Sequence, residues 1–229
     1  MVIMRGIKDL ERFITFEGIE GCGKTTQIKL AGEFLKQHHI PFVMSEEPGG
    51  THMGRRVREL LLNKVSGEDI CAEAEILLFS AARAQHVREV ILPALKRGEV
   101  VLCDRFNDAT LAYQGFGRGA DIRFIKEIND FSSSHLKPGM TILFDLSVEV
   151  GLKRAMDRIS LIREKAKDSA LEDRFEQEDL KFHRRVRDGY LFLAKQDPER
   201  FKIIGSAKDI MAIHREVCEH ISNFIRMLP

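Results

Sequence analysis

Short apolar segments and longer segments of helical periodicity alternate along the chain. The apolar segments have the length of β-strands and cover residues 13–16, 41–44, 100–103, 141–146 and 201–204. Strands that alternate with helices in this way are typical of βαβ units and of a parallel sheet. We therefore expect an α/β fold, in which a five-stranded parallel sheet is flanked by helices, and one domain that spans residues 1–229.

The helical segments are marked by apolar residues three or four positions apart. They cover residues 25–37, 72–97, 147 to about 158, and the segment from 206 onwards. Within the second of these, Pro93 and a polar break near Gln85 and His86 predict two helices rather than one.

Polar residues follow each of the five predicted strands directly. In a parallel sheet of this kind, ligands bind outside the carboxyl ends of the strands. The residues concerned are the loop 17–26, the segment 46–51, Asp104 with Arg105, Asp145, and Gly205 with Ser206. We therefore expect them to converge on one edge of the sheet and to form a single site there.

The loop after the first strand carries the most specific signal. Its residues are Gly18, Ile19, Glu20, Gly21, Cys22, Gly23, Lys24, Thr25 and Thr26. They fit the P-loop pattern G-x-x-x-x-G-K-[ST], in which backbone N–H groups surround the phosphates of a nucleoside triphosphate such as ATP. Lys24 is expected to reach the outer phosphates and Thr25 to bind Mg²⁺. An ordinary glycine-rich turn is the alternative, but it does not explain the Lys-Thr pair.

Two residues after the third strand are candidates for catalysis. Asp104 is expected to complete the Mg²⁺ shell with Thr25; the alternative is that it caps the following turn. Arg105 is placed to hold the phosphate of an acceptor, because its planar guanidinium matches two phosphate oxygens at once. The alternative for Arg105 is a surface ion pair with a neighbour such as Asp108.

A charged segment after the fourth strand is a candidate lid. Apart from Lys24 the P-loop holds no cation, so the positive charge that stabilises the transition state must come from elsewhere. A mobile, arginine-bearing lid at about residues 154–178 would supply it. We favour Arg158 as the catalytic arginine, with Arg154 and Arg163 as alternatives. A solvated helical face is the other interpretation of these charges.

Composition restricts the class of protein. The 229 residues include 36 basic and 35 acidic side chains, for a net charge of +1, which argues against a dedicated nucleic-acid or membrane-surface protein. The four cysteines show no C-x-x-C spacing, so neither a zinc site nor a disulfide framework is indicated and a reducing cytoplasm fits best. No apolar run approaches the length of a membrane span, and residues 1–12 lack the features of a signal peptide.

Several motifs resemble those of the thymidylate kinases, in the same order and at the same spacing, over nearly the whole chain. They are the P-loop, Glu47-Pro48-Gly49-Gly50-Thr51, residues 79–86, Asp104-Arg105-Phe106 with Ala112-Tyr113-Gln114-Gly115, and residues 150–154. The resemblance implies a P-loop NTPase fold and phosphoryl transfer from ATP to dTMP with Mg²⁺ in dTTP biosynthesis. It also implies a homodimer formed through the region of residues 72–84.

The resemblance further implies roles for the acceptor-binding residues. Phe79 would stack on the thymine, and Arg83, four residues later on the same helical face, would donate to the thymine O4 carbonyl. The alternatives are a core aromatic and an exposed helical arginine. The other implied substrate ligands are Thr110 and Gln114 at the base, Tyr113 beside the sugar, Glu20 near the 3′-hydroxyl, Arg105 and Arg58 at the acceptor phosphate, and Glu47.

The lid resembles that of the bacterial subtype whose members are similar to the enterobacterial enzyme. These have no basic residue inside the P-loop and carry the catalytic arginine in the lid, and residues 173–176 match the exit of that lid. Three features depart from the family pattern: Ala109 stands where serine is usual, Glu46 where arginine is common, and the lid is longer than in the shorter members.

Two other functions compete with this interpretation. A P-loop kinase for another nucleotide or small acid would have no use for the pair of Phe79 and Arg83. A GTPase-type switch that binds partners is disfavoured, because the chain contains no D-x-x-G and the segment 63–66 lacks the aspartate that would read guanine.

Overall fold

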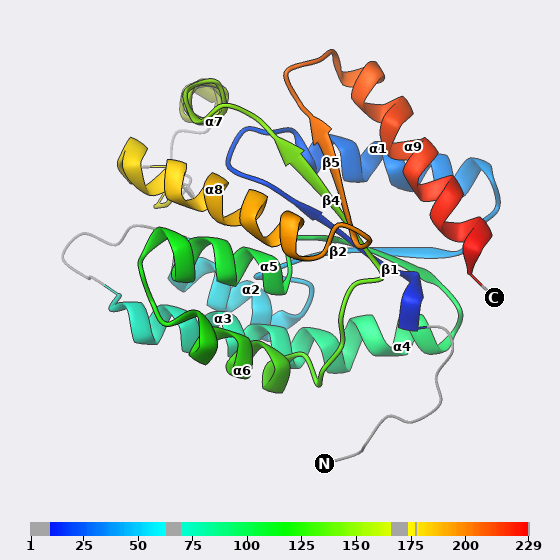
Figure 1. Cartoon of the computed structure of the whole chain (residues 1–229), viewed down its shortest axis with the longest axis horizontal. Coiled ribbons are helices and arrows are strands. Elements are labelled where there is room, and N and C mark those ends of the chain that lie inside the picture. The colour runs from blue at the N-terminus through cyan, green and yellow to red at the C-terminus, as the bar shows by residue number, and fades with distance from the viewer. Residues whose placement is uncertain (1–9, 63–69, 166–173, 177, 229) are drawn as a thin grey trace.

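A parallel β-sheet forms the centre of the molecule (Figure 1). The structure is a computed structural model and describes residues 10–62, 70–165, 174–176 and 178–228. Its strands are β1 (Phe13–Glu17), β2 (Phe42–Glu46), β3 (Val100–Asp104), β4 (Met140–Asp145) and β5 (Phe201–Gly205). They lie in the order β2-β3-β1-β4-β5, and all neighbours are parallel. The predicted α/β fold with a five-stranded parallel sheet is confirmed.

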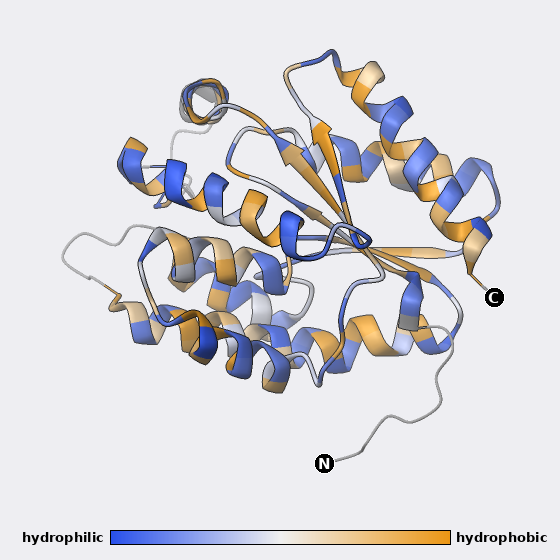
Figure 2. Cartoon of the chain, viewed as in Figure 1, coloured by the Kyte–Doolittle hydropathy of each residue, from blue (hydrophilic) through white to orange (hydrophobic). Residues whose placement is uncertain are grey.

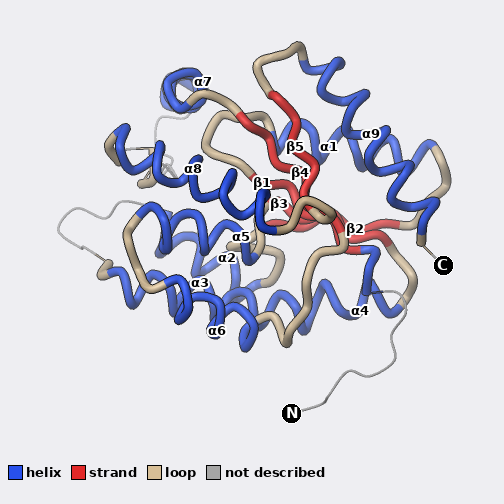
Figure 3. The backbone as a smooth tube through the Cα atoms, in the orientation of Figure 1, coloured by secondary structure: helices blue, strands red, loops and turns tan. Residues whose placement is uncertain are grey.

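Helices cover both faces of the sheet (Figure 3). Those before β3 are η1 (Leu10–Arg12), α1 (Lys24–Gln37), α2 (His52–Leu62), α3 (Ala72–His86), η2 (Val87–Ile91) and α4 (Leu92–Lys96). Those after β3 are α5 (Asn107–Thr110), η3 (Leu111–Gly117), α6 (Ile122–Ser132), α7 (Val148–Lys165), α8 (Leu180–Gln196) and α9 (Ile210–Met227). The helices α1 and α9 pack together on one face, and α3, α4 and α6 lie on the other (Figure 1).

The strands are apolar on both sides, as expected for a parallel sheet buried between helices (Figure 2). Successive side chains of β1 point to opposite faces. Phe13 belongs to the apolar cluster with residues of η2 and α4, whereas Ile14 and Phe16 belong to the larger cluster, which includes Ile28, Ala31 and Leu35 of α1. No helix of the described ranges has both the length and the apolar character needed to cross a bilayer.

The predicted break within residues 72–97 takes a different form from the one expected. The α-helix ends at His86, but the chain stays helical through the π-helical turn η2 and continues into α4, where Pro93 lies in the first turn. Because Pro93 has no backbone N–H, it cannot donate the next α-helical hydrogen bond, and the wider turn accommodates this change without a loop. The helix predicted from Ser147 is also longer than expected, since α7 extends to Lys165.

The carboxyl ends of the strands meet at one edge of the sheet. In the register of the sheet, Asp104 of β3 lies opposite both Phe16 of β1 and Glu46 of β2, and Asp145 of β4 lies opposite Gly205 of β5. The polar segments that follow these strands therefore begin side by side at this edge of the sheet.

Candidate active site

One cavity of about 270 Å³ opens at the carboxyl edge of the sheet. It brings together candidate residues from the P-loop and from the motifs at 47–51, 79–86, 104–106 and 112–115, although they lie far apart in the sequence. Residues 150–154, Asp145, Gly205 and Ser206 do not line it, so the strand ends of β4 and β5 do not join this site as expected. The candidates that line it are Glu20, Gly21, Lys24, Thr25, Glu47, Arg58, Phe79, Arg83, Asp104, Arg105, Thr110, Tyr113, Gln114 and Arg158. The predicted donor and acceptor residues therefore share a single space.

The P-loop folds tightly between β1 and α1. Gly21 has a φ of 68°, and a Cβ built on it would lie 2.0 Å from the backbone oxygen of Gly151, so only glycine fits there. The ammonium of Lys24 is buried and donates to the carbonyl oxygens of Gly18 and Ile19, each at 3.0 Å. Helix α1 begins at this lysine without a side-chain cap, which leaves its first N–H groups for an anion.

Thr25 and Asp104 supply oxygen ligands suited to magnesium. The hydroxyl of Thr25 donates to Oδ2 of Asp104 at 3.2 Å. The alternative, in which Asp104 caps the following turn, is wrong, because the N-cap of α5 is Phe106 and has no side-chain cap. Among the described residues no group of three or more His, Cys, Asp and Glu side chains could hold a metal ion. One carboxylate with one hydroxyl fits Mg²⁺, which keeps waters and takes further ligands from phosphates.

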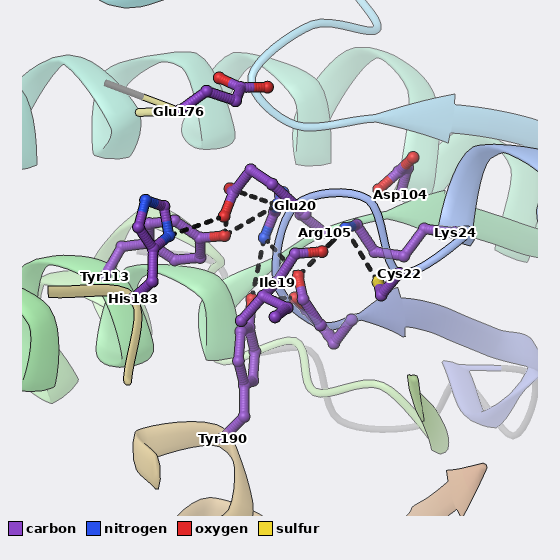
Figure 4. A network of polar contacts seen from close by, with 12 residues as sticks. Ile19, Glu20, Cys22, Lys24, Asp104, Arg105, Tyr113, Glu176, His183 and Tyr190 are labelled. Atoms are coloured by element: carbon purple, nitrogen blue, oxygen red, sulfur yellow. Dashed lines mark hydrogen bonds and ion pairs between the residues drawn. The ribbon is translucent and has the colours of Figure 1, made fainter. Parts of the chain in front are cut away.

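Arg105 is the centre of a buried polar network (Figure 4). Its Nη1 donates to the carbonyl oxygen of Gly18 at 3.1 Å and to the hydroxyl of Tyr190 at 3.0 Å. Its Nη2 donates to Oε1 of Glu20 at 3.1 Å and to the hydroxyl of Tyr113 at 2.9 Å. The guanidinium therefore lies beside the P-loop at the inner wall of the cavity.

The alternative of a surface ion pair between Arg105 and Asp108 is wrong. Asp108 is buried and forms an ion pair with Arg200 instead, with 2.6 Å between Nη1 and Oδ2. Arg105 itself is four-fifths covered by the protein, because its side chain is 20% exposed. A largely desolvated guanidinium that faces a cavity is suited to a dianionic ligand such as a phosphate.

Glu20 stays ionised at the centre of this network. Burial raises the pKa of its carboxyl group, but the His183 imidazole and the charges of Arg105 and Lys24 outweigh that effect and lower the pKa to about 2. His183 Nδ1 lies 3.3 Å from Oε2 of Glu20, and Tyr113 donates a hydrogen bond to Oε1. The carboxylate can therefore accept a hydrogen bond from a hydroxyl group in the cavity at any ordinary pH.

One wall of the cavity is built around Arg83. This side chain is only 2% exposed, so the alternative of an exposed helical arginine is wrong. Its Nε donates to Oε2 of Glu47 at 2.8 Å, and its two Nη atoms donate to Oδ1 of Asn129 at 2.6 Å and to Oγ1 of Thr110 at 2.8 Å. The guanidinium is thus held rigidly in a wall of the cavity. Phe79 is half-buried one helical turn away and also lines the cavity.

Glu75 connects Gln114, which lines the cavity, to Arg174 at the exit of the predicted lid. It is fully buried on α3 and accepts hydrogen bonds from Gln114 Nε2 at 2.8 Å, from Arg118 Nε at 2.7 Å and from Arg174 Nη2 at 2.6 Å. Phe175, which follows Arg174, is buried and meets the ring of Tyr113 edge to face, with 5.5 Å between ring centroids. Residues at the exit of the predicted lid are therefore part of the cavity wall.

Arg58 and Glu46 form an ion pair at the rim. Nη1 of Arg58 lies 3.2 Å from Oε2 of Glu46, and it also donates to the carbonyl oxygen of Pro48 at 3.0 Å. Glu46 departs from the family pattern, and in this chain its carboxylate pairs with Arg58. Ala109, a second departure, also lines the cavity.

The candidate lid arginines differ in their surroundings. Arg158 lines the cavity, is 56% exposed and lies 3.4 Å from Glu176. Arg154 instead donates to the carbonyl oxygen of Ser206 at 3.2 Å. The side chain of Arg163, Asp173 and most of the lid beyond α7 lie outside the described residues. The geometry therefore favours Arg158 over Arg154.

Comparisons with known proteins agree with this geometry. The family model of the thymidylate kinases matches residues 16–217. The chain belongs to the thymidylate kinase family. It is 59% identical over 217 residues to the thymidylate kinase of Syntrophus aciditrophicus (strain SB), covering 95% of this chain and 96% of that protein. It is 52% identical over 198 residues to the thymidylate kinase of Geobacter sp. (strain M21), covering 86% and 85%.

A solved structure extends the comparison to three dimensions. The crystal structure of the thymidylate kinase from Ehrlichia chaffeensis superimposes with a TM-score of 0.70 at 34% sequence identity, and the match covers 91% of this chain and 97% of that one. The P-loop NTPase fold of the thymidylate kinase family is therefore the fold of this chain, as predicted.

Several residues of this thymidylate kinase site carry no motif of their own in the sequence. They are Glu17, Glu75, Asn129, His183 and Tyr190. One signal is present for Glu17, because a carboxylate that ends an apolar strand is unusual and requires partners. Burial and the charge of Asp108 raise the pKa of Glu17 to about 8, which shows how strongly the fold encloses it.

Proposed function

We propose that this chain transfers the γ-phosphoryl group of ATP to the phosphate of dTMP, giving ADP and dTDP for dTTP biosynthesis in the cytoplasm. The observation that carries the proposal is the single cavity, which is lined by Lys24 and Thr25 of the P-loop, by Arg105, and by the pair of Phe79 and Arg83. Two phosphate-binding groups beside a base-sized pocket suit a nucleoside monophosphate acceptor. We further propose one domain with a lid at about residues 154–178.

On the donor side, the P-loop binds and orients the phosphates. The backbone N–H groups of residues 18–26 and the start of α1 surround them, and Lys24 exchanges its loop carbonyls for phosphate oxygens. Thr25 and Asp104 would hold Mg²⁺, which, when bound, neutralises charge on the β- and γ-phosphates. Arg158, which also lines the cavity, adds positive charge on the transferred group.

On the acceptor side, each part of dTMP has a partner of suitable chemistry. Arg105 and Arg58 bind the phosphate, the ionised Glu20 accepts a hydrogen bond from the 3′-hydroxyl, and Tyr113 packs beside the sugar. At the base, Phe79 stacks on the ring. The remaining base ligands are Arg83 as a donor to O4, with Thr110, Gln114 and Glu47 around it.

The proposal is tested by following product formation with purified protein, ATP and Mg²⁺. We expect dTDP and ADP in equal amounts when dTMP is present, and almost no ADP when it is omitted, because the acceptor completes the site. Release of phosphate from ATP without any acceptor would instead favour a nucleotide-binding switch. Phosphorylation of another small acid but not of dTMP would favour the other P-loop kinases.

We also propose that the protein is a homodimer that uses the region of α3. Helix α3 packs against both α2 and α6, and the three helices carry exposed large apolar side chains. These are Met53, Leu60, Leu77, Phe124 and Phe131. Apolar residues gathered on adjoining elements are typical of an interaction surface.

Sedimentation tests the dimer directly. We expect the native protein to sediment at twice the chain mass of 26.2 kDa. A Leu77→Glu variant, which places a charge on the exposed face of α3, is expected to sediment as a monomer. The matched control Lys29→Glu changes an exposed position of α1 and is expected to remain dimeric. A monomeric native protein at micromolar concentration would rule the dimer out.

A further inference from the structure

Arg105 has an unusual backbone conformation for a non-glycine residue. Its φ is 70°, in the left-handed region, which such residues occupy only when their surroundings hold them there. The backbone on both sides is fixed: the N–H of Arg105 donates to Phe16 at 3.1 Å, and the N–H of Phe106 donates to Oε1 of Glu17 at 2.7 Å. The strained residue is thus held partly by the side chain of Glu17.

The same carboxyl group also reaches the far end of the Arg105 side chain. Oε2 of Glu17 accepts a hydrogen bond from the hydroxyl of Tyr190 at 2.7 Å, and that hydroxyl accepts one from Nη1 of Arg105 at 3.0 Å. Glu17 and Tyr190 are at most 1% exposed, so a ligand that enters from solvent cannot reach either side chain. Neither of them lines the cavity.

We infer that Glu17 is a positioning residue, which fixes the backbone and the guanidinium of Arg105 at once and thereby sets the affinity for the acceptor phosphate. Glu17 holds the peptide group that follows Arg105 directly, and it holds the guanidinium through Tyr190. A guanidinium without these two contacts keeps its charge but loses its orientation, and bidentate recognition of a phosphate depends on orientation. The inference rests on the proposed phosphate site at Arg105.

The test compares the affinities for dTMP and for thymidine, which lacks the phosphate, by calorimetry. Tyr190→Phe removes only the hydroxyl, and Glu17→Leu removes both contacts. We expect each variant to weaken dTMP binding about tenfold or more, as for one lost hydrogen bond to a charged group, and to leave thymidine binding within about twofold. Glu17→Gln, which keeps an oxygen for Phe106 and a polar partner for Tyr190, is expected to restore most of the dTMP affinity.

Two controls separate positioning from a general effect. In an Arg105→Met background, Tyr190→Phe is expected to have no further effect on dTMP affinity, because it acts through Arg105. Glu33→Gln changes an exposed carboxylate on α1 and is expected to change neither affinity. Equal losses for dTMP and thymidine, or unchanged dTMP binding in Tyr190→Phe, would overturn the inference. Native protein that binds thymidine and dTMP equally would instead contradict the proposed phosphate site.

Discussion

Replacing Arg158 with alanine is expected to lower kcat for dTMP phosphorylation by about 10³-fold or more, with little change in dTMP affinity. An arginine that stabilises the transferring phosphoryl group contributes about 10³ to 10⁵ in rate. Apart from Lys24, the P-loop supplies no cation for this purpose. Arg158 lines the cavity and remains more than half exposed, with an ion pair to Glu176 at its edge. Its guanidinium group can therefore move towards a phosphate without disrupting the packing of the core.

The matched control for this prediction is Arg154→Ala. Arg154 lies one turn earlier on α7 and donates to the carbonyl of Ser206, so its loss is expected to change kcat far less. Steady-state kinetics and dTMP binding measurements together separate an effect on kcat from an effect on dTMP affinity. A near-normal kcat in Arg158→Ala would move the catalytic role to Arg154 or Arg163, or out of the lid.

Replacing Glu75 with glutamine is expected to lower the free energy of unfolding by about 3–5 kcal/mol, the usual cost of removing one partner of a buried ion pair. The carboxylate of Glu75 accepts from Gln114, Arg118 and Arg174, and it is fully buried. A glutamine offers one acceptor oxygen and directs its NH₂ group at a donor. The partly buried guanidinium groups of Arg118 and Arg174 then lose part of the charge that compensates them, and the wall formed by Phe175 loosens.

Urea denaturation measures this effect, and Glu73→Gln is the control. Glu73 lies on the same helix but is exposed, so its replacement is expected to change the free energy of unfolding by less than about 0.5 kcal/mol. We also expect Glu75→Gln to raise the KM for dTMP more than the KM for ATP, because Gln114 and Phe175 belong to the acceptor side. Equal stabilities of the two variants would contradict the role given to Glu75.

The strands and the location of the site were predictable because each depends on local pattern. The apolar runs specify buried strands, and a polar residue directly after such a run, as with Asp104 after β3, must lie at the carboxyl edge of the sheet. The P-loop is likewise one continuous segment. Because parallel strands end at one edge of the sheet, the P-loop and the residues that follow β2 and β3 meet in one cavity.

The supporting residues were not predictable, because their roles depend on contacts between distant positions. Glu75 and Arg174 are 99 residues apart, and Glu17 and Tyr190 are 173 apart. Taken singly, Glu75 has the appearance of an ordinary surface charge and Tyr190 that of a core aromatic. The π-helical turn after His86 was also missed, since a single wide turn has no periodic signature in the sequence.

The ratio of kcat/KM for dTMP to that for dCMP tests the central claim most directly. Arg83 is a donor fixed by Glu47, Asn129 and Thr110, and it matches the O4 carbonyl of thymine but opposes the amino group of cytosine. A site built to hydrogen-bond one partner rejects the mismatched analogue strongly. We predict that dTMP is preferred by at least about 10²-fold in the presence of ATP and Mg²⁺. Equal values for dTMP and dCMP would contradict the assignment of this site to thymidylate.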